Sequence, residues 1–131
     1  MNLNFTISEL CKSDIAKQKN IKNIPNLEEL DNMLCLIVLC LQPIREYLKK
    51  PMIISSGYRT AALNKIVKGV TKSQHIKGQA VDFIVPGLSI NNVINKIKQS
   101  GIEFDQLINE YDKWIHISYN KNKNRKQILK Y

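Results

Sequence analysis

A run of apolar residues at helical spacing between positions 27 and 48 constrains the fold of this chain more than any other feature. Asn26 and Glu29 form a capping-box pattern at its start, which predicts that a helix begins there. Apolar residues then recur every three or four positions and share one face of the helix. They are Leu27, Leu30, Leu34, Ile37, Leu41, Ile44 and Leu48, with Met33 and Val38 beside them. The rest of the chain must cover this face, and Pro43 is expected to kink the helix or divide it.

Four short segments downstream of this helix have the composition of β-strands. They are residues 52–59, 79–85, 104–111 and 114–119. The first is expected to be buried, and the last two alternate between apolar and polar residues, which is typical of a hairpin. A three-residue loop at 111–113 would pair Glu110 with Trp114, whereas a two-residue loop at 112–113 would reverse which residues share a face. The pattern leaves both loops open.

Helices are predicted between these strands. Residues 60–69 favour a short helix closed by Gly69, and a second, amphipathic helix begins after Ser89 and ends before Gly101. This order predicts an α+β fold, with N-terminal helices packed on a small antiparallel β-sheet and one helix inserted. A chain of 131 residues is expected to form a single domain, 1–131, whose last part, from about residue 120, is a basic tail.

The chain is strongly basic, with a net charge of +9. Such a charge attracts polyanions, among them nucleic acid, anionic lipid and the anionic bacterial cell wall. The tail is expected to be solvated, and no nucleic-acid motif accompanies it, so no specific nucleic acid is expected as a partner. No apolar stretch is long enough to span a bilayer, and the N-terminus lacks the regions of a secretory signal. We expect a monomer with no membrane partner.

Two predicted strands each carry a polar residue that needs a partner. Asp82 stands in the apolar segment AVDFIV, where an unpaired carboxylate is costly to bury. His116 stands in WIHIS, with both isoleucines on the other face of the strand. The only other histidine, His75, precedes Asp82 on a loop that Gly78 allows to turn sharply. Because these side chains suit zinc, we hypothesise that all three hold one ion. The alternative is that His116 is a hydrogen-bonded structural residue.

Three motifs together resemble a known enzyme family. They are Ser-Gly-Tyr-Arg at 56–59, Ser-x-His-x-x-Gly-x-Ala-x-Asp at 73–82 and Trp-x-His at 114–116. The set is similar to the hallmark of the zinc D-alanyl-D-alanine carboxypeptidases, which include bacterial and phage peptidoglycan peptidases and the vancomycin-resistance dipeptidases. The likeness extends from about residue 5 to residue 119. Lys68-Gly69 replaces a pair of glycines common in the family, so substrate preference is expected to differ.

The resemblance implies a zinc peptidase with the fold shared by D-Ala-D-Ala peptidases and hedgehog domains. His75, Asp82 and His116 would bind one zinc ion. The enzyme would cut peptide bonds next to D-amino acids in peptidoglycan stem peptides, as a D-Ala-D-Ala carboxypeptidase or an endolysin-type endopeptidase. Arg59 would bind substrate and stabilise the charge that develops on its carbonyl oxygen.

Supporting positions follow from the same resemblance and from the strand pattern. Ser73 would bind substrate or orient His75, and Trp114 would contact substrate or pack near the site. Ser118, on the strand face of His116, is a candidate for orienting a histidine. Asn64 is expected to brace the loop around Arg59 rather than touch substrate.

The resemblance also implies a general base shortly before the last histidine. The position used in some members holds Lys113 here, so Glu110 and Asp112 remain as candidates. With a three-residue hairpin loop, Glu110 shares a face with His116 and is preferred. Asp112 then lies in the turn, where aspartate is common for local reasons. A two-residue loop would weaken the choice of Glu110.

Because no secretory signal is visible, we expect a phage or prophage protein that is made in the cytoplasm and acts on the bacterial cell wall. A holin would release it, or a virion would carry it. An alternative function keeps the fold and the metal without catalysis, as a cell-wall-binding or virion structural module.

Overall fold

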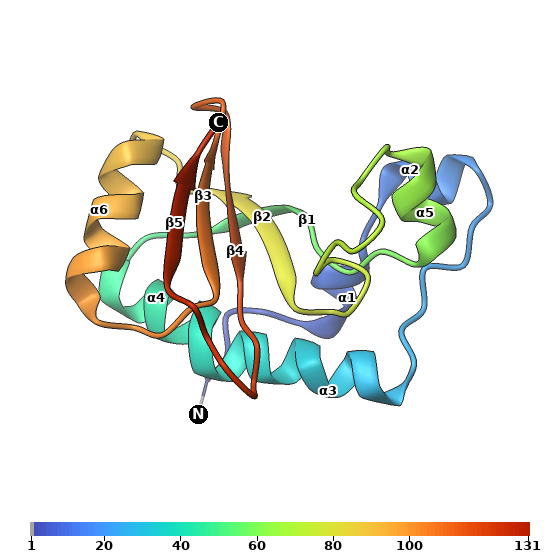
Figure 1. Ribbon diagram of the computed structural model, residues 1–131, viewed down its shortest axis with the longest axis horizontal. Helices are drawn as coiled ribbons and strands as arrows, with labels where there is room; N and C mark the ends of the chain where they lie inside the picture. The colour runs from blue at the N-terminus through green and yellow to red at the C-terminus, as the bar shows by residue number, and fades with distance from the viewer. Residues whose placement is uncertain (1) are drawn as a thin grey trace.

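The computed structural model describes residues 2–131, and its strands form one five-stranded sheet in the order β1-β2-β4-β3-β5 (Figure 1). The strands are β1 (Ile53–Ser56), β2 (Ala80–Ile84), β3 (Gln106–Glu110), β4 (Trp114–Ser118) and β5 (Gln127–Lys130). The first four pair antiparallel, whereas β5 lies parallel to β3. The α+β class is confirmed, and the expectation of a wholly antiparallel sheet is wrong at this edge.

The basic segment 120–131, expected to be a solvated tail, ends in strand β5. Backbone pairing with β3 holds it, from Gln106 opposite Gln127 to Asn109 opposite Lys130. Most β5 side chains are exposed. An edge strand of this kind shows no apolar alternation in the sequence, because its order comes from backbone hydrogen bonds rather than from burial.

Helices cover one side of the sheet and one of its ends (Figure 1). They are α1 (Ile7–Cys11), α2 (Asp14–Gln18), α3 (Leu27–Leu36), α4 (Gln42–Leu48), α5 (Ala61–Ile66) and α6 (Ile90–Ser100), with the π-helical turn η1 (Ile37–Leu41) joining α3 to α4. The capping box of Asn26 and Glu29 is present, as predicted. None of these helices, in the part of the chain described, is long and apolar enough to cross a membrane.

The π turn explains how Pro43 interrupts the long helix. The N–H of Gln42 bonds to the carbonyl of Ile37, five residues back, and Pro43 follows in the first turn of α4. Proline has no N–H and its ring clashes with the carbonyl four residues earlier, so a wider turn before it relieves both problems. The predicted division of the helix at this residue is confirmed.

The predicted apolar stripe is correct only from this turn onward. Ile37, Leu41 and Ile44 are buried, but Leu27 and Leu34 are 85% and 45% exposed. Before the turn, the buried residues are Asn32, Met33 and Leu36. A π turn shifts the phase of the helix, so one regular stripe cannot face the core on both sides of it.

The core lies between the helices and one face of the sheet. Val81 and Phe83 of β2 and Ile115 and Ile117 of β4 are completely buried there. Because side chains alternate along a strand, the residues between them point to the opposite face. The edge strand β1 is half exposed, which corrects the expectation of a buried strand. The second face of the sheet is thus free to carry a site.

Asp105 anchors the C-terminal segment and gives a test of its order. Its carboxylate is buried and accepts bonds of 2.8–2.9 Å from the backbone N–H and the guanidinium of Arg125 and from Gln74. Asp105→Ala should lower the free energy of unfolding by about 2–4 kcal/mol, because these donors lose their acceptor. The control Glu103→Ala removes only an exposed pair with Lys126 and should cost less than about 1 kcal/mol.

The same pair predicts a pH dependence. The hydrogen bonds from Arg125 outweigh burial and hold the pKa of Asp105 below its ordinary value. Its stabilising contribution is therefore complete above the unfolded pKa of about 3.9 and is lost as the pH falls through the folded pKa. In urea denaturation, the cost of Asp105→Ala should shrink between about pH 6 and pH 2. A cost that stays constant over this range would contradict the assignment.

Candidate metal centre

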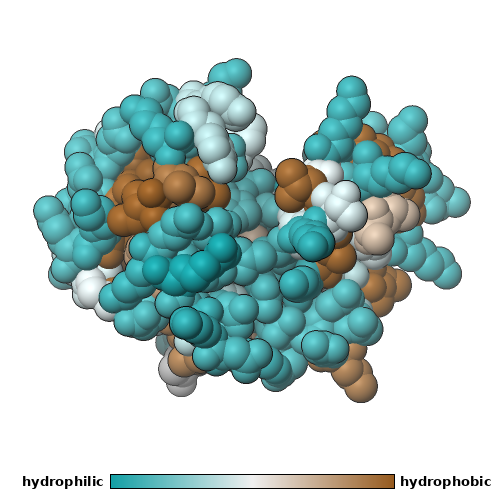
Figure 2. Space-filling model, viewed as in Figure 1, coloured by the Kyte–Doolittle hydropathy of each residue, from teal (hydrophilic) through white to brown (hydrophobic). Residues whose placement is uncertain are grey.

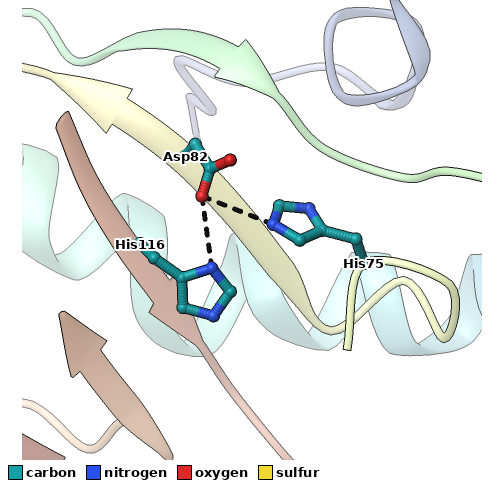
Figure 3. A group of neighbouring side chains, drawn as sticks. All are labelled: His75, Asp82 and His116. Carbon is teal, nitrogen blue, oxygen red and sulfur yellow. Dashed lines mark hydrogen bonds and ion pairs between the residues drawn. The ribbon is translucent and has the colours of Figure 1, made fainter. Parts of the chain in front are cut away.

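Three elements bring the predicted ligands together (Figure 3). Asp82 on β2 and His116 on β4 are register partners in the sheet. His75 lies on the loop before β2 and is turned toward them. Gly78 in this loop has φ +74°, and a Cβ there would lie 2.5 Å from the carbonyl oxygen of Glu29. The sharp turn predicted at Gly78 is therefore confirmed, and two separate constraints favour glycine.

The separations of the donor atoms suit a zinc ion. Asp82 Oδ1 lies 3.3 Å from Nε2 of His75 and 3.2 Å from Nδ1 of His116. All three donor atoms lie within 4.8 Å of one another. Ligands about 2.0–2.1 Å from a tetrahedral zinc ion are separated by about 3.3 Å. The group thus has the chemistry of a three-ligand zinc site, and Asp82 Oδ1 lies at the matching distance from both imidazoles.

The hydrogen bond of His75 supports a cation at this position. Its Nδ1 lies 2.7 Å from the carbonyl oxygen of Gly57, which can only accept, so Nδ1 carries the hydrogen. Burial lowers the pKa of His75, which favours the neutral ring. In that form, the lone pair of Nε2 faces a carboxylate oxygen of Asp82, and two acceptors at this distance repel unless a cation lies between them.

Asp82 is buried but remains ionised. Burial alone would raise its pKa, but the neighbouring imidazoles of His116 and His75 outweigh this effect and hold the pKa well below its ordinary value. The second oxygen, Oδ2, lies 3.5 Å from Nη2 of Arg59. One carboxylate thus faces two imidazoles with one oxygen and a guanidinium with the other.

Arg59 is held in place by neutral partners. Its Nε donates to Ser56 Oγ at 3.1 Å and its Nη1 to Asn64 Oδ1 at 3.0 Å. Asn64 also donates to the carbonyl of Val70 at 2.9 Å, which confirms its predicted role as a brace. Burial lowers the pKa of Arg59 while Asp82 opposes the shift. The guanidinium has further N–H groups for another acceptor.

The residue that closes helix α5 is not the one predicted. Lys68, not Gly69, adopts the left-handed conformation that follows the helix, with φ 61°. Gly69 is required for a different reason, since a Cβ there would clash with Asn64 Oδ1 and lie 2.8 Å from Arg59 Nη1. The glycine lets the loop approach this pair closely.

The hairpin register separates the two candidate bases. Glu110 pairs with Trp114 and Ile108 with His116, so the loop has three residues and Glu110 shares the face of His116. Glu110 lines the cavity that contains His116. Burial raises the pKa of Glu110, and Asp82 adds to the shift while His116 opposes it. Asp112 lies in the turn, where Asn109 donates to its carboxylate at 2.7 Å.

The remaining predicted residues have distinct surroundings. Ser73 is buried, and its Oγ accepts from the backbone N–H of His75 at 3.1 Å. Trp114 is half-buried and lines the cleft. Ser118 Oγ instead accepts from the N–H of Gln106, so it does not orient a histidine.

Two supports of the site were missed in the sequence. The carbonyl of Gly57 fixes the His75 ring, but any residue has a carbonyl, so no side chain reveals it. Gln74, next to His75, donates to Asp105 at 2.9 Å and so connects the loop to the C-terminal segment. The pairing of polar side chains far apart in the chain has no local signal.

The fold and this His-Asp-His group define a candidate metallopeptidase centre. The family model for Peptidase M15 matches residues 3–118. The chain belongs to this family of zinc-dependent peptidases, which confirms the resemblance inferred from the motifs. No curated protein matches the chain. The matched region contains every candidate site residue named above and ends before β5.

Proposed function

We propose that this protein is a zinc-dependent peptidase that hydrolyses peptide bonds next to D-amino acids in bacterial peptidoglycan stem peptides. Membership of the Peptidase M15 family supports the class of enzyme. The observation that carries the proposal is the position of Asp82 Oδ1, 3.3 and 3.2 Å from nitrogens of His75 and His116. A D-Ala-D-Ala carboxypeptidase and an endolysin-type endopeptidase both fit this centre.

The metal and the protein supply different parts of the chemistry. A zinc ion held by His75, Asp82 and His116 would lower the pKa of a water molecule toward neutrality and polarise the substrate carbonyl. Glu110 would accept a proton from the attacking water and deliver it to the leaving amine. Its raised pKa suits a group that must both take and return a proton. Arg59 stabilises the negative charge that develops on the carbonyl oxygen.

Digestion of purified sacculi tests the proposal directly. The zinc-loaded protein should release peptide fragments that mass spectrometry of the muropeptides identifies, and a chelator should abolish the release. Re-addition of zinc should restore it. A zinc-loaded protein that binds sacculi but releases no fragment would instead support the alternative, a non-catalytic cell-wall-binding or virion structural module.

The proposed place of action is the bacterial cell wall, with the protein acting as a monomer in phage lysis or on a virion. The net charge of +9 supports binding to the anionic polymers of the wall. This attraction should weaken as the ionic strength rises, because salt screens exposed charges.

Gly69→Ala tests the proposed role of Arg59 without replacing Arg59 itself. The new methyl group would displace Asn64 and the Arg59 guanidinium. Hydrolysis by the zinc-loaded protein should fall by about 10²-fold to 10³-fold, the loss seen when an oxyanion donor is removed. In the control Gly87→Ala, no atom lies within 4 Å of the new Cβ, although φ is +86°. It should cost about 1 kcal/mol of stability and leave hydrolysis unchanged. Equal activity of the two variants would contradict the role.

A further inference from the structure

The cleft extends to both sides of the candidate metal centre. One arm has a volume of about 730 Å³ and is lined by His75, His116 and Glu110, among others. The second has a volume of about 530 Å³ and reaches toward α2. Both are lined by Arg59, Val67, Asp82 and Trp114. They are therefore two arms of one cleft that meets at Asp82, and the surface is hollowed between the sheet and α5 (Figure 2).

The position of Glu110 decides which part of a substrate each arm takes. Glu110 lines the larger arm and not the smaller one. During hydrolysis, the peptide C–N bond breaks, the oxygen of water joins the carbonyl carbon, and Glu110 carries a proton to the leaving nitrogen. The leaving amine must lie within hydrogen-bond reach of Glu110. The C-terminal part of the substrate therefore occupies the larger arm, and the acyl part occupies the smaller one.

The larger arm has more volume than a carboxypeptidase requires for the single residue that it releases. Cavities of about 300–1,000 Å³ hold drug-sized ligands, and this arm lies in the upper half of that range. A released D-alanine has one methyl group as its side chain and would fill only a small part of the space. The arm matches a leaving segment of several residues.

The charge on the larger arm indicates an acidic segment. Lys68 and Lys72 line it and are exposed, whereas the cationic Arg125 in the same wall is already paired with Asp105. Lys68 adopts a left-handed conformation, with φ 61°, that glycine would adopt without strain. Its exposed side chain supplies a positive charge at the wall of the cleft.

We infer that this protein is an endopeptidase whose leaving segment contains more than one residue and carries a side-chain carboxylate, rather than only its C-terminal one, bound by Lys68 and Lys72. This inference rests on the proposed function and selects between the two activities that the metal centre allows.

Three synthetic stem peptides test the inference. The first has a free C-terminal carboxylate, and the second has a C-terminal amide. The third also has a C-terminal amide, and its glutamate side-chain carboxylate is converted to an amide as well. The zinc-loaded protein should cut the first two at the same internal bond, at rates within about threefold, since exposed charges far from the bond contribute little. The product from the C-terminal side should contain two or more residues. Release of a single residue, from the free acid only, would overturn the inference and leave the proposed peptidase intact.

Matched variants test the lysines. The third peptide should be cut about threefold to tenfold less efficiently than the second, as kcat/KM, because two exposed ion pairs are lost. In Lys68→Gly/Lys72→Ala, this preference for the second peptide over the third should disappear. The control Lys49→Gly/Lys50→Ala removes the same charge, and Lys49 has φ 55° but lines neither arm. It should keep the preference. A preference retained by Lys68→Gly/Lys72→Ala would refute the charge assignment, and zinc-loaded protein that cuts no peptide would refute the proposed function itself.

Discussion

Replacing Glu110 by glutamine should reduce hydrolysis by the zinc-loaded protein by about 10²-fold to 10⁴-fold, the usual contribution of general acid–base catalysis. Glutamine has nearly the same shape but cannot accept or return a proton. Zinc content should be unchanged, because Glu110 is not one of the three grouped donors. The measurements are kcat/KM on a cleaved stem peptide, zinc content by elemental analysis and the unfolding temperature.

Asp112→Asn is the matched control for this substitution. Asp112 lies two positions further along the same hairpin, and its carboxylate accepts from Asn109 in the turn. The variant should keep its hydrolytic rate within about a factor of three, because the side chain lies outside both arms of the cleft. A large loss of activity in Asp112→Asn, together with an active Glu110→Gln protein, would reverse the assignment of the base.

Replacing His116 by alanine should weaken zinc binding by more than about 10²-fold, since even residues that only orient ligands account for 10-fold to 100-fold. The variant leaves the core face of β4 intact, because Ile115 and Ile117 are unchanged and fully buried. Competition with a chelator measures the affinity. Added zinc should also raise the unfolding temperature of the unaltered protein and not that of His116→Ala, because only a bound ion stabilises the folded state.

Ser118→Ala provides the control on the same strand. Ser118 points to the same face as His116, but its Oγ accepts from Gln106 rather than from a ligand. We expect a loss of about 1 kcal/mol of stability from this hydrogen bond and an unchanged affinity for zinc. Tight binding of one zinc ion by His116→Ala would show that the grouped side chains do not form the metal site.

Local patterns predicted much of the site. A carboxylate and an imidazole placed in apolar strands, Asp82 and His116, indicated partners that burial would require, and the structure brings them together with His75. The capping box at Asn26 and the helix between Ser89 and Gly101 are also as predicted. Each of these signals depends on residues within a few positions of one another.

Other features depended on contacts that no local pattern records. The π turn before Pro43 shifted the buried face of the long helix, so Leu27 and Leu34 are exposed. The C-terminal segment became an edge strand through backbone bonds to β3 and through the Asp105–Arg125 pair. The hairpin pattern allowed two loops, and the pairing of Glu110 with Trp114 selected one.

The sequence by itself determined the α+β class, the order of most helices and strands, and the residues able to hold a metal ion, because these follow from periodicity and from the cost of burying polar groups. The tertiary structure alone decided that one carboxylate oxygen lies between two imidazoles, that Glu110 rather than Asp112 shares the face of His116, and how the cleft divides around Asp82. Such distances depend on how strands and loops far apart in the chain pack together, and packing is a property of the whole fold.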